Sequence, residues 1–299
     1  MNDLQRNRWV EEVLIEVMKA LIHDPKLCEI LVFKGAWILN FHLQESRHSR
    51  DIDAAAEPGW VRAMGGMEGE EAFLREHLPR AVKRYFERQN PVRFTLSEAK
   101  FKRNPRSTHP HGWDMIQVSL LIQDNQKQGV RALPAAELEI AAPESYSADA
   151  IETRDFLGMP AHVYSLHRIA GEKLRAYLTS LPEYRLKMGA AREFRVKDLH
   201  DIARIVRHRP IEHIDFWMKA GHEFRLACES RYVDCLGPET FKQDWEAVRV
   251  RYEQDEHLRV VSFVEVESAL EQVLEFLRHR GAFPLAYPLP ILLYAQRQL

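Results

Sequence analysis

The chain has 299 residues, about twice the length of a typical single domain, so it can form one large domain or two packed ones. Its 42 Lys plus Arg and 44 Asp plus Glu give a formal net charge of −2, which excludes a global attraction to nucleic acid. A hydrophobic fraction of 45% and a charged fraction of 29% fit a globular protein and neither a disordered nor a collagen-like one.

Cysteine usage and hydropathy indicate a cytoplasmic protein. Cys28, Cys228 and Cys235 are too scattered for a disulfide framework or a paired-cysteine metal site. The first residues lack the basic and then apolar pattern of a secretory signal. No apolar run approaches the roughly 20 residues of a membrane-spanning helix, so we expect no membrane contact.

The start of the chain alternates between helical and extended patterns. Apolar residues at helical spacing between Trp9 and Ile22 predict an amphipathic helix. The run from Cys28 to Phe33 predicts a buried strand, followed by a tight turn at Lys34 and Gly35 and a helix over residues 36–43. Residues 51–55 predict the neighbouring strand.

The rest of the chain changes from a mixed pattern to a helical one. We expect a helix over 72–89 and strands over 92–98, 115–122 and 137–141. Helices are then expected over 165–178, 195–207, 211–225, 241–253 and 263–278. Because residues 150–161 have a loop-like composition, we predict an α/β domain over 1–155 and a helical domain over 156–299. The expected fold class is α+β, with a small mixed sheet flanked by helices and followed by an all-helical half.

Asp51 and Asp53 form the most informative pair of side chains. In a strand they share one face, while Ile52 points to the other. A divalent cation removes their mutual repulsion, and Mg²⁺, or Mn²⁺, suits such oxygen ligands and can bridge them to phosphates. The alternative is a pair of surface aspartates neutralised by Arg47 and Arg50.

The turn before this strand has the features of a phosphate site. Gly35 precedes a helix, whose first backbone N–H groups lack partners within the helix and whose dipole favours an anion. A strand, Lys34-Gly35, a helix and a second strand opening with two acids together favour nucleotide chemistry over the surface alternative.

These segments resemble a known family. The chain is similar to the AbiEii/AbiGii toxin-type nucleotidyltransferases of the polymerase-beta-like superfamily in Leu31-Val32-Phe33-Lys34-Gly35, Arg47-x-Ser49-x-Asp51-Ile52-Asp53, Glu172-Lys173-Leu174-Arg175-Ala176 and Arg195-Val196-Lys197-Asp198-Leu199-His200-Asp201-Ile202. The similarity spans residues 30 to about 206. One departure is Gly35-Ala36, where the family usually has Gly-Gly or Gly-Ser, so a hydroxyl contact to phosphate is missing.

The resemblance implies a reaction, its substrates and a set of site residues. It implies Mg²⁺-dependent transfer of a nucleoside monophosphate from an NTP to a hydroxyl of RNA, possibly tRNA, or of a protein. It also implies a toxin of a toxin-antitoxin or abortive-infection system with a cognate antitoxin. The implied metal ligands are Asp51, Asp53 and Glu139; the implied catalytic residues are these three and Asp198; the implied nucleotide contacts are Lys34, Gly35, Ser49 and Lys173.

The residues alone leave two choices for the third carboxylate. Glu139 fits the family's pattern of a hydrophobic residue, an acid and Ile, but Glu137 lies on the same strand face by alternation. Asp114 is a weaker rival. Ser49 has an equally simple interpretation as a turn hydroxyl.

Lys173 falls inside the apolar stripe of its expected helix, seven residues after Leu166. A buried ammonium needs an anion, so we expect Lys173 to meet a phosphate in a cleft between the two domains, or to extend to the rim. Asp198 lies at the flank of its own helix's stripe and Asp201 farther away, so the resemblance favours Asp198 as the site residue.

Other features suggest alternatives. His200-Asp201, with further histidines such as His167, resembles a metal phosphohydrolase pattern, although we interpret the pair as surface residues. His109-Pro110-His111 could bind a metal but is more typical of a turn. A non-catalytic nucleotide- or partner-binding member is the third alternative. Local basic runs that could contact phosphates are Lys100 to Arg106 and the set Arg185, Lys187, Arg192, Arg195 and Lys197.

Overall fold

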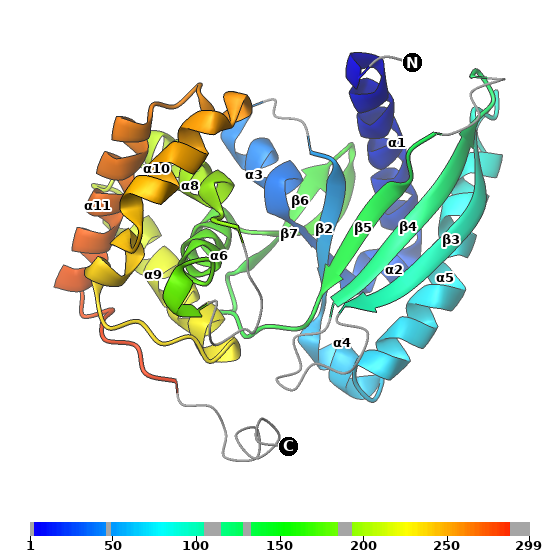
Figure 1. Ribbon diagram of the computed structural model, residues 1–299. Helices are drawn as coiled ribbons and strands as arrows, with labels where there is room; N and C mark the ends of the chain where they lie inside the picture. Colours follow the sequence, from blue (N-terminus) through cyan, green and yellow to red (C-terminus); the bar gives the residue numbers. More distant parts are fainter. Residues whose placement is uncertain (1–2, 46–48, 105–114, 128–132, 185–192, 288–299) are drawn as a thin grey trace, which may run out of the picture. The chain divides into compact units, whose positions relative to one another are not determined.

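The computed structural model describes residues 3–45, 49–104, 115–127, 133–184 and 193–287. The chain folds as two compact units, which we call the sheet unit (Met1–Pro143 with Ile151–Tyr164) and the helical unit (Glu144–Ala150 with Ser165–Leu299). Figure 1 shows the mixed sheet with its helices and the separate group of helices. The predicted α+β class, with an all-helical second half, is confirmed.

The sheet unit is built on a seven-stranded sheet of order β3-β4-β5-β2-β1-β7-β6. Its strands are β1 Leu31–Lys34, β2 Asp51–Ala56, β3 Phe94–Asn104, β4 Met115–Asp124, β5 Ala136–Ala141, β6 Ile151–Phe156 and β7 Met159–Tyr164. β2 runs parallel to β5 and β1 runs parallel to β7, while the other neighbours are antiparallel. The sheet is therefore mixed, as expected.

Helices pack against one face of this sheet. The sheet unit contains α1 Asp3–His23, α2 Pro25–Ile30, α3 Gly35–Leu43, α4 Pro58–Ala63 and α5 Met67–Glu87. α1 and α5 lie on the same side (Figure 1), where Trp9 Nε1 of α1 donates to Asp124 Oδ2 at 2.9 Å and Arg103 of β3 pairs with Glu71 of α5 at 3.0 Å. The strand residues on this face are apolar and buried, among them Ile52, Ala54, Val118, Leu138 and Ile140.

The expected strand from Cys28 to Phe33 is wrong in its first half. Residues 25–30 form the short helix α2, and the strand begins only at Leu31. Asp24 causes this, because its side chain accepts hydrogen bonds from the backbone N–H groups of Lys26 and Leu27, while Pro25 occupies the first helical position.

The expected loop over 150–161 is also wrong. The chain forms a hairpin of β6 and β7 around Leu157 and Gly158, which have φ of 57° and 81°. A two-residue turn with two positive φ angles matches the twist of a hairpin, but leucine rarely adopts that conformation and so hides the turn in the sequence.

The helical unit contains helices at most of the predicted positions. They are α6 Leu166–Leu178, α8 Val196–His208, α9 Ile214–Ser230, η1 Pro238–Lys242, α10 Trp245–Gln254, η2 Glu256–Leu258 and α11 Phe263–His279. α6 begins at Ser165, whose hydroxyl caps the backbone N–H of Arg168. Gly171 allows α6 to approach α9, since a Cβ there would lie 2.6 Å from the backbone nitrogen of Phe224. The two helices therefore pack closely.

A buried ion network explains why residues 144–150 belong to the helical unit. Arg168 of α6 is fully buried and contacts Glu144 at 2.7 Å and Glu223 of α9 at 3.0 Å. Because a buried guanidinium needs partners, Glu144 ties this segment to α6. Strands β6 and β7 then return to the sheet.

No helix in the described part of the chain is long and apolar enough to cross a membrane. After α11 the structure describes residues 281–287, in which Leu285 pairs with Cys235 in an isolated β-bridge. The remainder lies outside the described residues.

Candidate active site

The two aspartates of β2 lie on the face of the sheet opposite to α1 and α5. Asp51 and Asp53 are partly exposed, whereas Ile52 is 1% and Ala54 0% exposed. The alternation expected from the sequence is therefore present in the strand. We call this side, which carries Asp51 and Asp53, the polar face.

The sheet register brings further polar residues beside each aspartate. Asp53 is opposite Lys34 on β1 and Glu139 on β5, and Glu139 is opposite Gln117 on β4. Residues opposed in this way on neighbouring strands share a face, and their strands lie about 4.8 Å apart. Asp53 and Glu139 therefore stand side by side on the polar face.

A second row runs parallel to the first, two residues away along the strands. Asp51 is opposite Glu137, which is opposite Ser119. Ser119 Oγ donates to Glu137 Oε2 at 2.7 Å. Ser49, which is 8% exposed, donates to Asp51 Oδ1 at 3.0 Å and to its carbonyl oxygen at 3.2 Å. The Ser49 hydroxyl thus orients Asp51.

Gly35 brings the start of α3 against Asp53. Its φ is +71°, and a Cβ on Gly35 would lie 2.6 Å from Asp53 Cγ and 2.7 Å from Asp53 Cβ. Only glycine fits both the backbone conformation and this spacing. Lys34 is the residue before the helix and makes no side-chain cap, and its Nζ lies 5.4 Å from the centre of the Tyr164 ring. The helix start and Lys34 therefore border the aspartates.

The donor set of the polar face suits a hard divalent cation. Asp51, Asp53 and Glu139 offer only carboxylate oxygens and are partly exposed to solvent; Asp53 and Glu139 are neighbours on adjacent strands, and Asp51 is two residues from Asp53 on β2. Mg²⁺ and Mn²⁺ bind oxygen ligands of this kind. Because the carboxylates are partly exposed, a cation bound to them is not buried among apolar side chains. The residues present fit the metal that the sequence predicts.

Lys173, on α6, is buried and held by two aspartates of α8. Its Nζ lies 2.8 Å from Asp198 Oδ1 and 2.8 Å from Asp201 Oδ2. Asp198 also pairs with Arg195, and Asp201 pairs with Arg204 at 3.2 Å. The anion expected for Lys173 is thus supplied within the helical unit by this pair.

The charges of this cluster stabilise one another. Burial alone would lower the pKa of Lys173, but Asp198 and Asp201 outweigh it and raise the pKa above its ordinary value. Burial would raise the pKa of Asp198, yet Lys173 and Arg195 hold it well below its usual range. Lys173 and Asp198 are therefore both charged at neutral pH.

Two expectations about α8 are corrected. Asp201 is 1% exposed and binds Lys173 as closely as Asp198 does, so it does not lie away from the packed face. His200 is 2% exposed and lies 3.0 Å from the Tyr252 hydroxyl, so His200-Asp201 is not a surface pair. The spacing of Asp198 and Asp201, three residues apart on a helix, was the signal that both could reach one cation.

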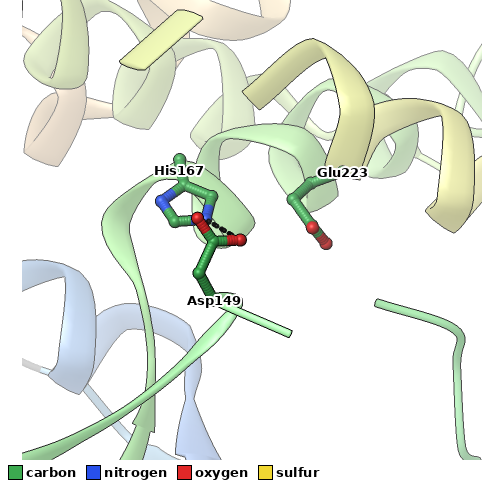
Figure 2. A group of neighbouring side chains, drawn as sticks. All are labelled: Asp149, His167 and Glu223. Carbon is green, nitrogen blue, oxygen red and sulfur yellow. Dashed lines mark ion pairs between the residues drawn. The ribbon is translucent and has the colours of Figure 1, made fainter. Parts of the chain in front are cut away.

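A separate cluster in the helical unit bears on the phosphohydrolase alternative. Asp149, His167 and Glu223 form a group of three potential metal ligands whose donor atoms all lie within 4.8 Å of one another (Figure 2). Among the described residues, the carboxylates of the polar face do not lie as close together as this. Its carboxylates already have cations, because Asp149 pairs with Lys219 at 2.5 Å and Glu223 with Arg168 at 3.0 Å. A metal would have to displace these pairs, so the cluster is a structural ion network.

Several sequence candidates lie outside the described residues. They are Arg47, the rival acid Asp114, the His109-Pro110-His111 segment, and Arg185, Lys187 and Arg192 of the second basic run.

Comparison with known proteins identifies the family. Residues 16–278 match the family described as "Nucleotidyl transferase AbiEii toxin, Type IV TA system". No curated protein matches the sequence. Among solved structures, the chain is similar to MenT4, the nucleotidyltransferase toxin Rv2826c from Mycobacterium tuberculosis H37Rv, at 16% identity and a TM-score of 0.39, over 92% of this chain and 93% of that one. Because the family match covers most of the sequence, this chain belongs to the AbiEii nucleotidyltransferase toxin family.

Proposed function

We propose that the protein transfers a nucleoside monophosphate from an NTP to a hydroxyl group of RNA, possibly tRNA, or of a protein, in a Mg²⁺-dependent reaction. The observation that carries this proposal is the side-by-side placement of Asp53 and Glu139, with Asp51 on the same face. Asp53 and Glu139 are direct neighbours and Asp51 is two residues from Asp53, so their charges repel one another, and a bound cation removes that repulsion. This arrangement therefore favours metal-dependent chemistry at the polar face.

Asp51, Asp53 and Glu139 are the proposed metal ligands. Bound Mg²⁺, or Mn²⁺, supplies charge neutralisation for the carboxylates and for substrate phosphates. We assign Glu139 rather than Glu137 because Glu139 is the direct neighbour of Asp53, the aspartate that lies against Gly35 at the start of α3, while Glu137 is the neighbour of Asp51. Ser49 holds Asp51 in position.

The nucleotide's phosphates are proposed to lie at the start of α3. The backbone N–H groups of its first turn and the Lys34 ammonium can bind anions there, next to Asp53. Ala36 offers no hydroxyl, so the backbone and Lys34 carry this contact. Gly35 makes the approach possible.

In the proposed step the acceptor hydroxyl oxygen forms a bond to the α-phosphorus, and the bond from this phosphorus to the bridging oxygen of the β-phosphate breaks. Pyrophosphate leaves with that electron pair. The hydroxyl proton passes to a carboxylate oxygen of Asp53 or Glu139. As in phosphoryl transfer generally, these residues act mainly by positioning and charge.

Lys173 and Asp198 remain proposed nucleotide-site residues. An ammonium has three N–H donors, and Asp198 and Asp201 occupy two of them. The side chain of Lys173 is 14% exposed, and the resemblance to the family is what supports a phosphate as the partner of its third donor. Asp198 would then act as a positioning residue for Lys173.

The family also suggests a protein partner and a cellular location. A toxin of a type IV toxin-antitoxin system implies a cognate antitoxin, and the proposed NTP and RNA substrates favour a reaction in the cytoplasm. We propose both for this protein.

Incubation of the purified protein with each labelled NTP and bulk RNA, with Mg²⁺ or with a chelator, tests the activity. We expect label on RNA or protein only with Mg²⁺. If the protein binds nucleotide but labels nothing, it is the non-catalytic member that the missing hydroxyl at Ala36 would favour.

A further inference from the structure

We infer that β3 carries the acceptor-binding surface, with Lys100 and Lys102 holding the phosphate backbone of a single-stranded nucleic acid whose end reaches the acids of β2 and β5. This inference rests on the proposed function and adds its acceptor class and positioning residues. It commits to nucleic acid and not to a protein acceptor.

The two lysines point to the polar face. Lys100 and Lys102 are two residues apart on β3 and exposed, so they share one face of the strand. The intervening Phe101 lies on the other face, where the Arg75 guanidinium of α5 is 5.0 Å from the centre of its ring. Because α5 covers that side, the lysines lie on the side of Asp53.

The register places each lysine in line with an acid. Lys102 is opposite Gln117, which is opposite Glu139, and Lys100 is opposite Ser119, which is opposite Glu137. Three strand spacings of about 4.8 Å separate β3 from β2, or about 15 Å. At about 3.4 Å per nucleotide in a stacked strand, this is roughly four nucleotides.

On the polar face, the charge changes from negative at β2 and β5 to positive at β3, which suits an acceptor strand that is held at β3 and reaches the acids only with its end. The acids of β2 and β5 repel a phosphate backbone, the next strand offers the neutral Gln117 and Ser119, and the edge strand offers Lys102 and Lys100, the latter paired with Glu98. With a formal net charge of −2, the chain has no global attraction, so binding needs such a local patch.

Lys100 can exchange its ion pair with Glu98 for a contact with phosphate. Lys100 pairs with Glu98 at 3.2 Å, and the two side chains are 60% and 54% exposed. Such an exposed pair contributes little to stability, so a phosphate can replace Glu98. On the opposite side of the acids lie Lys34 and the start of α3, the proposed site of the nucleotide phosphates. The acids thus separate nucleotide from acceptor.

The test compares Lys100→Gln/Lys102→Gln with a control, Lys26→Gln/Lys83→Gln, which removes the same charge from exposed positions on α2 and α5. Anisotropy of a fluorescent 12-nucleotide RNA is measured over a series of salt concentrations. We expect the first variant to bind at least about tenfold more weakly at low salt, with a salt slope reduced by about 1.4, and the control to match the wild type. Wild-type affinity and slope in the first variant would overturn the inference.

Calorimetric titration with NTP and the transfer assay separate this inference from the proposed function. Nucleotide affinity should stay unchanged in the Lys100→Gln/Lys102→Gln variant, because its lysines lie beyond the acids. Loss of RNA binding in that variant without transfer by the wild type would contradict the proposed function and support the surface. Transfer to protein, with no RNA bound by the wild type, would support the proposed function and overturn the surface.

Discussion

Gly35 lies so close to Asp53 that a Cβ at this glycine would be 2.7 Å from the aspartate's own Cβ. Rotation of the Asp53 side chain cannot relieve this overlap, so the start of α3 or the strand would have to move. We expect Gly35→Ala to lower the free energy of unfolding by about 2 to 4 kcal/mol and to abolish transfer, because the φ of +71° adds strain. Thermal or urea unfolding and the transfer assay measure both effects.

Gly158 supplies a matched control for that substitution. Its φ of +81° is similar, but a Cβ there meets nothing within 4 Å in the described structure. Gly158→Ala should cost only the backbone strain, about 1 kcal/mol, and leave activity intact. Equal losses of stability and activity in the two variants would show that the short distance between Gly35 and Asp53 affects neither.

Glu139 is opposite Asp53 in the sheet, whereas Glu137 is opposite Asp51, and their glutamine variants test that difference. We expect Glu139→Gln to reduce transfer by at least about a hundredfold, since it removes a proposed metal ligand beside Asp53. Glu137→Gln keeps an oxygen acceptor for Ser119 and should change transfer by less than about tenfold. Rates at saturating Mg²⁺ decide; a larger loss in Glu137→Gln would reverse the assignment.

The sequence predicted β2 well because Asp51, Ile52 and Asp53 alternate, and alternation is local. It could not choose between Glu137 and Glu139, because strand register joins residues more than 80 positions apart. The β6–β7 hairpin was hidden by Leu157 at positive φ.

The helical unit shows the same limit. The stripe on α6 predicted a buried Lys173, but its partners lie on another helix.

Lys173→Met tests the cluster in the helical unit. Methionine fills the space but leaves Asp198 and Asp201 without their shared cation, although Arg195 and Arg204 remain. We expect a loss of stability on the order of 3 kcal/mol. The control, Lys219→Met, removes an exposed pair with Asp149 and should cost less than about 1 kcal/mol. An unchanged or raised melting temperature for Lys173→Met would show that the cluster contributes no net stability.

Glu70, in the first turn of α5, makes stability depend on pH. Its side chain is fully buried, and neither carboxylate oxygen hydrogen-bonds to a described residue. Burial raises its pKa to about 7, although Arg103 opposes this. The folded state therefore holds this proton more tightly than the unfolded state, whose pKa is about 4.3, and stability is lost as pH rises through the window between them.

The expected loss is about 3 kcal/mol between pH 4 and pH 8. Glu70→Gln should remove this pH dependence. The free energy of unfolding of the variant, relative to that of the wild type, should therefore be higher at pH 8 than at pH 4.5. The exposed Glu68→Gln, in the same turn, should not. Urea unfolding at several pH values measures the difference, and parallel curves for wild type and Glu70→Gln would refute it.

If the carboxylates of the polar face perform Mg²⁺-dependent nucleotidyl transfer, Asp53→Asn should abolish transfer and leave the fold intact. The change keeps the shape of the side chain and removes one of the repelling charges, so the variant should fold with an equal or slightly higher melting temperature. Transfer of labelled nucleotide should fall below detection at every Mg²⁺ concentration, while the wild type labels its acceptor. A folded Asp53→Asn variant with near-wild-type turnover would show that the polar face does not hold the catalytic metal.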